Sequence, residues 1–226
     1  MKPNIFLCGF FLLLSVCLAA CGSSKNKNTS EKETNQENNV QVPEFNADSA
    51  YLYIQKQVAF GPRVPNTEAH RKCGGYLSQQ LRDFGATVYN QFGDVISYDG
   101  KVLKMHNVIG SYNLDTKKRV LLCAHWDSRP YADAGQEAHY HTPIDGANDG
   151  ASGVGVLLEI ARHLQQQAPA IGIDIVFFDA EDYGIPEFYE GDYKQDTWCL
   201  GSQYWGRVPP VSYTHLRAHE TSAHLV

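Results

Sequence analysis

Three blocks within residues 120–182 indicate the architecture: VLLCAHWDS from residue 120, GANDGASG from residue 146 and VFFDAED from residue 176. Residues 120–124 are wholly apolar, and residues 171–178 are almost wholly apolar apart from Asp174. Continuous apolar runs are typical of strands that are buried on both faces. Between them, residues 151–166 carry apolar side chains at helical spacing. The pattern predicts a strand–helix–strand unit with parallel strands, and therefore an α/β fold.

Acidic and histidine side chains gather where these strands end, at the edge where open parallel sheets bind their ligands. They are His125, Asp127, Asp149, Asp179, Glu181 and Asp182. Zinc binds histidine nitrogen and carboxylate oxygen, and a catalytic zinc site keeps one position open. Of the adjacent Glu181 and Asp182, one could bind metal while the other transfers protons. Taken singly, each acid could be a helix cap and His125 a hydrogen-bonded core residue, but three converging segments favour a metal site.

Composition restricts the class of protein. The chain has 226 residues, 43% hydrophobic and 12% aromatic, which suits one globular α/β domain. The net charge is −6 and the longest basic run is only residues 117–119, so we expect no nucleic-acid partner. Three of the six cysteines belong to the leader, and the other three are Cys73, Cys123 and Cys199. We interpret Cys123, inside an apolar strand, as a small core residue.

The N-terminus has the pattern of a lipoprotein signal peptide, residues 1–21. An apolar stretch too short for an ordinary membrane span ends in LAAC, which resembles a bacterial lipobox with Cys21 as the lipidated residue. A plain secretory signal with a chance cysteine is the alternative. Residues 22–41 are rich in Ser, Asn, Lys and Glu, as a disordered tether would be. We therefore expect an exported protein, anchored by lipid to a bacterial membrane and facing the periplasm or the cell surface.

The folded domain is expected to span residues 42–208. Apolar spacing predicts a short helix around Ile54 and a second helix capped by Asn66, with Gly85 as its C-terminal stop. Two strands follow at residues 86–92 and 102–112.

The C-terminal end departs from this pattern. Residues 209–226 resemble translated adaptor sequence, and we interpret them as a non-native tail; a genuine divergent C-terminus is the alternative. Four candidate strands are fewer than a typical sheet has, so we expect the natural chain to continue past about residue 208.

Three blocks of this sequence carry a resemblance to a known family. Residues 120–128, 146–153 and 177–182 resemble the signature blocks of the M28 zinc-peptidase superfamily. FGPRVP at residues 60–65 and WCLGSQY at residues 198–204 are similar to its glutaminyl cyclase branch. The resemblance implies a mixed, mostly parallel sheet flanked by helices, incomplete at the C-terminus.

Position by position, the resemblance implies roles for five residues. Asp149 and Asp182 would be zinc ligands, and Glu181 the general acid/base. His125 would be a metal ligand in two-zinc aminopeptidases but only a neighbour of the metal in single-zinc cyclases. Asp127, like His125, would either bind a second metal ion or support the metal ligands from behind.

The family's remaining ligand is a downstream histidine without a matching position in this chain. Histidines 215, 219 and 224 lie in the suspect tail and are not assigned. Because two carboxylates without a histidine should hold zinc poorly, we expect weak or no activity of the chain as it stands.

The resemblance implies cyclisation of an N-terminal glutamine of peptides or proteins to pyroglutamate, with release of ammonia. Zinc would polarise the γ-carbonyl, and Glu181 would carry the proton from the attacking amine to the departing ammonia. In the alternative, an aminopeptidase, Glu181 would activate water to hydrolyse the first peptide bond. One zinc favours the cyclase and two the aminopeptidase, whereas a non-catalytic binding module would have none. Trp198 is a candidate for the substrate pocket, with core packing as the alternative.

Overall fold

The computed structural model describes residues 42–210. The predictions for residues 1–41, including the lipidation of Cys21, lie outside the described residues, as does nearly all of the tail that begins at residue 209. Among residues 42–210, no helix has both the length and the apolar content needed to cross a bilayer.

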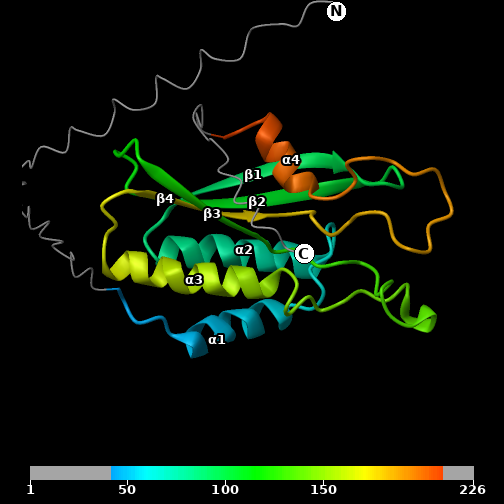
Figure 1. Ribbon diagram of the computed structural model, residues 1–226, viewed down its shortest axis with the longest axis horizontal. Helices are drawn as coiled ribbons and strands as arrows, with labels where there is room; N and C mark the ends of the chain where they lie inside the picture. The colour runs from blue at the N-terminus through cyan, green and yellow to red at the C-terminus, as the bar shows by residue number, and fades with distance from the viewer. Residues whose placement is uncertain (1–41, 211–226) are drawn as a thin grey trace, which may run out of the picture. The chain divides into compact units, whose positions relative to one another are not determined.

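A mixed sheet of four described strands forms the centre of the fold (Figure 1). The strands are β1 (Thr87–Ile96), β2 (Val102–Tyr112), β3 (Arg119–His125) and β4 (Gly172–Phe178), in the order β1-β2-β4-β3. The α/β class and the mixed sheet are confirmed. The parallel share is smaller than expected, because only β3–β4 is parallel while β1–β2 and β2–β4 are antiparallel. A short hairpin connection forces β1 and β2 to be antiparallel, and only the strand–helix–strand unit provides a parallel crossover.

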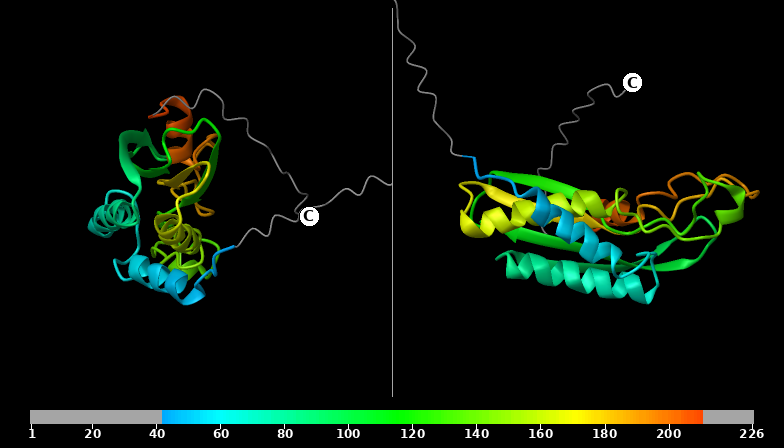
Figure 2. Two further views of the ribbon diagram at one scale, coloured as in Figure 1. Left: turned by 90° about the vertical axis from the view of Figure 1, so that its left-hand side faces the viewer. Right: turned by 90° about the horizontal axis from the view of Figure 1, so that it is seen from below.

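Helices cover both faces of this sheet (Figures 1 and 2). On one face lie α2 (Glu68–Asp83) and α3 (Ala151–Gln166), with α1 (Ala47–Val58) packed outside α3; α4 (Leu200–Arg207) lies on the other. A short 3-10 helix, η1 (Glu137–His139), lies in the loop after β3. Because strand side chains alternate between faces, Val108 packs under α2 and α3 whereas Ile109 packs on the side of Trp205. The predicted helix at residues 151–166 is confirmed to the residue.

The start of α2 corrects one prediction. Thr67, not Asn66, caps the helix: its hydroxyl accepts the His70 N–H at 3.2 Å. Asn66 has a φ of 74°, outside the extended region that an N-cap adopts. Its side chain instead bonds the Val102 carbonyl and the Lys104 N–H, at 2.9 and 2.8 Å, where β2 extends beyond its pairing with β4. Gly85, with a φ of +81°, ends the helix as predicted.

Strand β3 is less buried than its apolar sequence predicts. β4 is buried along its whole length, but Val120 of β3 is 40% exposed and Cys123 is also exposed. The reason is the strand order, since β3 has only one neighbour among the described strands. The interpretation of Cys123 as a core residue is therefore wrong, since its side chain is exposed on β3.

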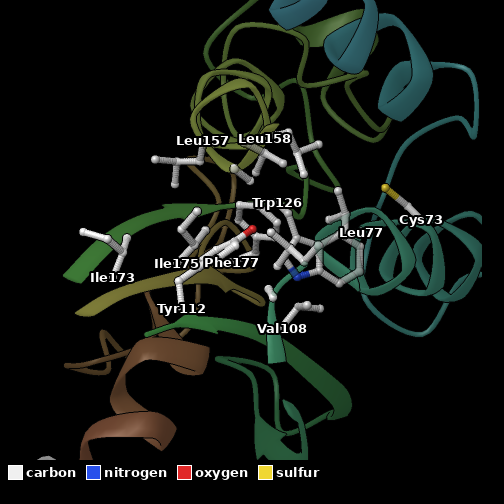
Figure 3. Packing of buried hydrophobic residues seen from close by; sticks show 14 residues of the cluster. Cys73, Leu77, Val108, Tyr112, Trp126, Leu157, Leu158, Ile173, Ile175 and Phe177 are labelled. Atoms are coloured by element: carbon white, nitrogen blue, oxygen red, sulfur yellow. The ribbon is translucent and has the colours of Figure 1, made fainter. Parts of the chain in front are cut away.

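Trp126 fixes the chain as it leaves β3. Its fully buried indole stacks on His70 with ring centroids 4.4 Å apart, and its Nε1 donates to the His106 carbonyl at 3.1 Å. It lies in the same apolar cluster as Leu77 and Phe177 (Figure 3). Because Trp126 is held inside, its neighbours His125 and Asp127 are delivered to the carboxyl edge of the sheet.

Candidate metal centre

Three segments bring one histidine and two aspartates together. His125 ends β3, Asp149 lies in the loop before α3, and Asp182 follows β4. One ligand atom of each lies within 4.8 Å of the others, and His125 Nε2 is 2.9 Å from Asp149 Oδ1. The approach requires glycine at position 150, where φ is +86° and a Cβ would lie 2.7 Å from the Asp127 carbonyl oxygen.

The carboxylate of Asp182 is buried without full compensation. The residue is 8% exposed, and its Oδ2 has no hydrogen-bond partner among the described residues. Burial, together with the charges of Asp127 and Asp149, raises its pKa to about 7. A buried carboxylate oxygen without a partner is costly unless a cation or a donor meets it. One imidazole nitrogen and two carboxylates match the donors that zinc takes in catalytic sites, so the residues fit a zinc ion.

His125 lies between two carboxylates. Burial by itself lowers its pKa, but the hydrogen bond and charge of Asp127, with Glu181 and Asp182, outweigh burial and raise the pKa to about 9. Its Nδ1 is 3.5 Å from Asp127 Oδ1, and its Nε2 faces Asp149. The structure thus brings His125, which the resemblance gave as a metal ligand or a neighbour of the metal, within reach of both aspartates. Binding a metal through His125 requires loss of its proton.

Asp127 holds the turn that carries Glu181 and Asp182. It is fully buried; its Oδ1 accepts the Glu181 N–H and its Oδ2 the Asp182 N–H, each at 3.1 Å. Because both oxygens are engaged with the main chain, the geometry favours Asp127 as a support behind the ligands over a second-metal ligand.

Glu181 lies half-buried beside this group. Burial raises the pKa of its carboxyl, the charge of His125 opposes that shift, and Asp127 and Asp149 add to it. Its carbonyl accepts the Cys199 N–H at 3.0 Å, so the entry to α4 holds the turn from the other side. Ala180 within the turn has a φ of 53°, a left-handed conformation that is unfavourable for alanine.

Asp179 is the one acid of the predicted edge that lies beneath the site. It is fully buried, and its carboxylate oxygens are 2.9 and 2.8 Å from His70 Nε2. It also accepts the His106 N–H at 2.6 Å. Sequence reasoning missed His70, because a histidine inside a helical pattern carries no local signal of its distant partner.

Trp198 and Arg129 flank the Asp182 turn. The indole is 41% exposed, and its ring centroid lies 4.6 Å from Arg129 Cζ. Arg129 Nη1 donates to the Asp182 carbonyl at 2.9 Å, and the same guanidinium pairs with Asp133. Trp198 is therefore linked through Arg129 to the main chain of Asp182, and its contact with substrate stays a prediction. Arg129 was not predicted.

Comparison with known proteins places the chain in a family. The sequence model of peptidase family M28 matches residues 107–219, half of the chain. The chain belongs to peptidase family M28. The predicted resemblance is confirmed, and it extends to solved members. The chain is 62% identical to Bacteroides thetaiotaomicron glutaminyl cyclase, crystallised with N-acetylhistamine, over 77% of this chain and 60% of that one, with a TM-score of 0.75.

Two further relatives are a solved bacterial structure and a curated animal protein. A Zn-dependent exopeptidase from Parabacteroides distasonis is 60% identical, over 76% of this chain and 59% of the other, with a TM-score of 0.74. The glutaminyl-peptide cyclotransferase of Drosophila melanogaster is 31% identical over 129 residues, covering 54% of this chain and 33% of the relative. The chain thus spans about three fifths of these solved relatives and a third of the curated one.

Proposed function

We propose that this M28 protein catalyses the cyclisation of N-terminal glutamine in peptides or proteins to pyroglutamate, with release of ammonia. The observation that carries this proposal is the position of Glu181, which precedes the metal-group residue Asp182 in the chain. Its carboxyl has a raised pKa, and its main-chain N–H is held by a hydrogen bond to Asp127. The 62% identity to a bacterial glutaminyl cyclase supports the choice of reaction.

Asp149 and Asp182 would hold the zinc ion, with His125 as a further ligand or a close neighbour. Zinc bound there would supply Lewis-acid polarisation of the γ-carboxamide carbonyl. The Oδ2 of Asp182 supports this assignment, because it is buried and has no hydrogen-bond partner among the described residues. A bound cation would compensate the cost of removing this charge from water.

Glu181 moves the proton. As the α-amine nitrogen of the glutamine attacks the γ-carbonyl carbon, the Glu181 carboxylate takes a proton from that nitrogen. As the bond between the γ-carbon and the amide nitrogen breaks, the same carboxyl returns the proton to the departing ammonia. A carboxyl whose pKa is raised by burial suits both steps, because a raised pKa makes it a better proton acceptor than an ordinary glutamate while it can still return the proton. Asp127 keeps the main chain of Glu181 in place throughout.

Hydrolysis of the first peptide bond is the alternative: one relative at 60% identity is a Zn-dependent exopeptidase, but the glutaminyl cyclases at 62% and 63% identity favour cyclisation. The residues are shared, and Glu181 would then take its proton from water. The two reactions differ in their products, since cyclisation consumes no water and leaves every peptide bond intact.

The test is a mass-spectrometric assay with a peptide that begins in glutamine, using protein expressed from the natural gene with its own 3′ end. Loss of ammonia with the peptide bond intact, abolished in Glu181→Gln, is the expected result. Glu187→Gln is a matched control, because Glu187 is an exposed acid in the loop that follows. Release of the free first residue would replace the cyclase by the exopeptidase reading, and no product in either form would refute both.

We also propose that the protein is exported and anchored to a bacterial membrane through a lipid on Cys21, facing the periplasm or the cell surface. The lipobox-like LAAC and the polar residues after it support this. Metabolic labelling with a fatty acid, lost in Cys21→Ser, is the expected result; an unlabelled protein that is secreted freely would refute the anchor.

A further inference from the structure

The FGPRVP motif at residues 60–65 has no part in the proposed chemistry, yet its arginine is fully buried. The guanidinium of Arg63 donates only to main-chain carbonyls: Nε to Trp126 at 3.1 Å, Nη2 to Gly146 at 2.9 Å, and Nη1 to Asp145. Trp126 follows His125 directly, whereas Asp145 and Gly146 lie in the loop that carries Asp149. One side chain therefore joins the two loops that supply the His125–Asp149 pair.

The surroundings of Arg63 are shaped for this arrangement. Gly146 has a φ of +57°, and a Cβ there would lie 3.0 Å from Arg63 Nη2 and 2.8 Å from the Ser128 Cβ. Ser128 in turn donates its N–H to the Arg63 carbonyl at 3.3 Å, so the main chain of Arg63 also contacts the loop after β3. Glycine at 146 is what lets its carbonyl approach the guanidinium.

The charge of Arg63 gives the contacts their strength. Burial lowers its pKa, and the nearby Asp127 and Asp145 carboxylates act in the opposite direction; an arginine stays protonated in either case. Among residues 42–210 it forms no ion pair with a carboxylate at contact distance. A buried cation must then be compensated by charge-assisted bonds to carbonyls, and displacing any of them leaves a costly desolvated group.

We infer that Arg63 is a positioning residue for the metal centre: by clamping the Trp126 carbonyl against those of Asp145 and Gly146, it sets the separation of His125 from Asp149. The inference rests on the proposed zinc site but not on which reaction that site catalyses. Lysine cannot replace arginine here, because one ammonium lacks the planar fork that reaches three carbonyls.

The test compares Arg63→Lys with Arg119→Lys in the full chain. Arg119 is a matched control at the opposite end of β3, where its guanidinium bonds Asp174 at 2.7 and 2.8 Å and the Tyr112 carbonyl at 3.0 Å. Zinc affinity is measured by chelator competition, and amide hydrogen exchange is followed by mass spectrometry. We expect Arg63→Lys to weaken zinc binding by about 10- to 100-fold and to speed exchange in residues 126–128 and 145–151. Arg119→Lys should change neither.

The outcomes separate this inference from the proposed zinc site. Equal zinc affinity in Arg63→Lys and the parent, or an equal loss in both variants, overturns the positioning role. If the parent protein takes up no zinc, the proposed zinc site is overturned for this chain, and hydrogen exchange still tests the positioning role of Arg63. Faster exchange in Arg63→Lys that is confined to residues 126–128 and 145–151 supports this role. Unchanged exchange, or exchange that is faster throughout the chain, overturns it. If Arg63→Lys does not fold, Arg63→Gln, which keeps a donor without the charge, is measured in the same two ways.

Discussion

Replacing Asp127 by asparagine tests how the turn that carries Glu181 and Asp182 is held in place. The aspartate is fully buried, and each of its oxygens accepts one N–H, from Glu181 and from Asp182, at 3.1 Å. Asparagine has the same shape but only one acceptor oxygen. Its NH₂ group would face the main-chain N–H of either Glu181 or Asp182. That N–H would lose its acceptor and would meet another hydrogen-bond donor instead.

The magnitude follows from these two contacts. A hydrogen bond to a charged group contributes about 1.5–3 kcal/mol, and breaking one so that a buried donor keeps no partner costs somewhat more than that contribution. We therefore expect Asp127→Asn to lower the free energy of unfolding by about 2–4 kcal/mol, or the Tm by roughly 5–15 °C for a chain of this size. Because the turn carrying Glu181 is released, kcat for cyclisation should fall by about 10- to 100-fold.

Urea denaturation and the mass-spectrometric cyclisation assay measure the two effects. Asp174→Asn is the control: Asp174 is also buried and bonds Ser111 and Arg119, but it lies near the amino end of β4. It should lose stability while its folded fraction keeps parental kcat. The reasoning is refuted if Asp127→Asn unfolds at the parental urea concentration, or if its kcat stays within about twofold of that of Asp174→Asn.

Three further predictions concern single side chains. Tyr112→Phe should raise the free energy of unfolding by about 1 kcal/mol in urea, since the Tyr112 hydroxyl is buried without a partner among the described residues; a loss of stability would contradict this. Ala180→Gly should leave stability within about 1 kcal/mol, because relief of the left-handed φ of 53° offsets the flexibility gained, whereas Ala180→Val should lose more than about 2 kcal/mol in the same assay. Burial, with a smaller effect of His70, lowers the pKa of His106 to about 4, so protonation favours the unfolded chain: stability should fall by up to about 3 kcal/mol from pH 6.5 to pH 4, and a parental slope in His106→Gln would refute this.

Local sequence pattern was enough to predict several elements of this protein. The apolar runs and the helical spacing between them predicted β3, α3 and β4, and α3 has the predicted bounds. The polar residues that follow each strand predicted the edge where His125, Asp149 and Asp182 meet. These features follow from period and chain order, which neighbouring residues set without reference to distant ones.

The contacts that hold this edge of the sheet became visible in the folded chain. Asp127 reaches Glu181 across 54 residues, Arg63 reaches Trp126 across 63, and His70 reaches Asp179 across 109. The same holds for β3, whose apolar sequence predicts burial on both faces although its exposure depends on which strands lie beside it. Contacts between residues so far apart leave no periodic pattern in the local sequence. They depend on which helices and strands pack together, which is a property of the whole fold.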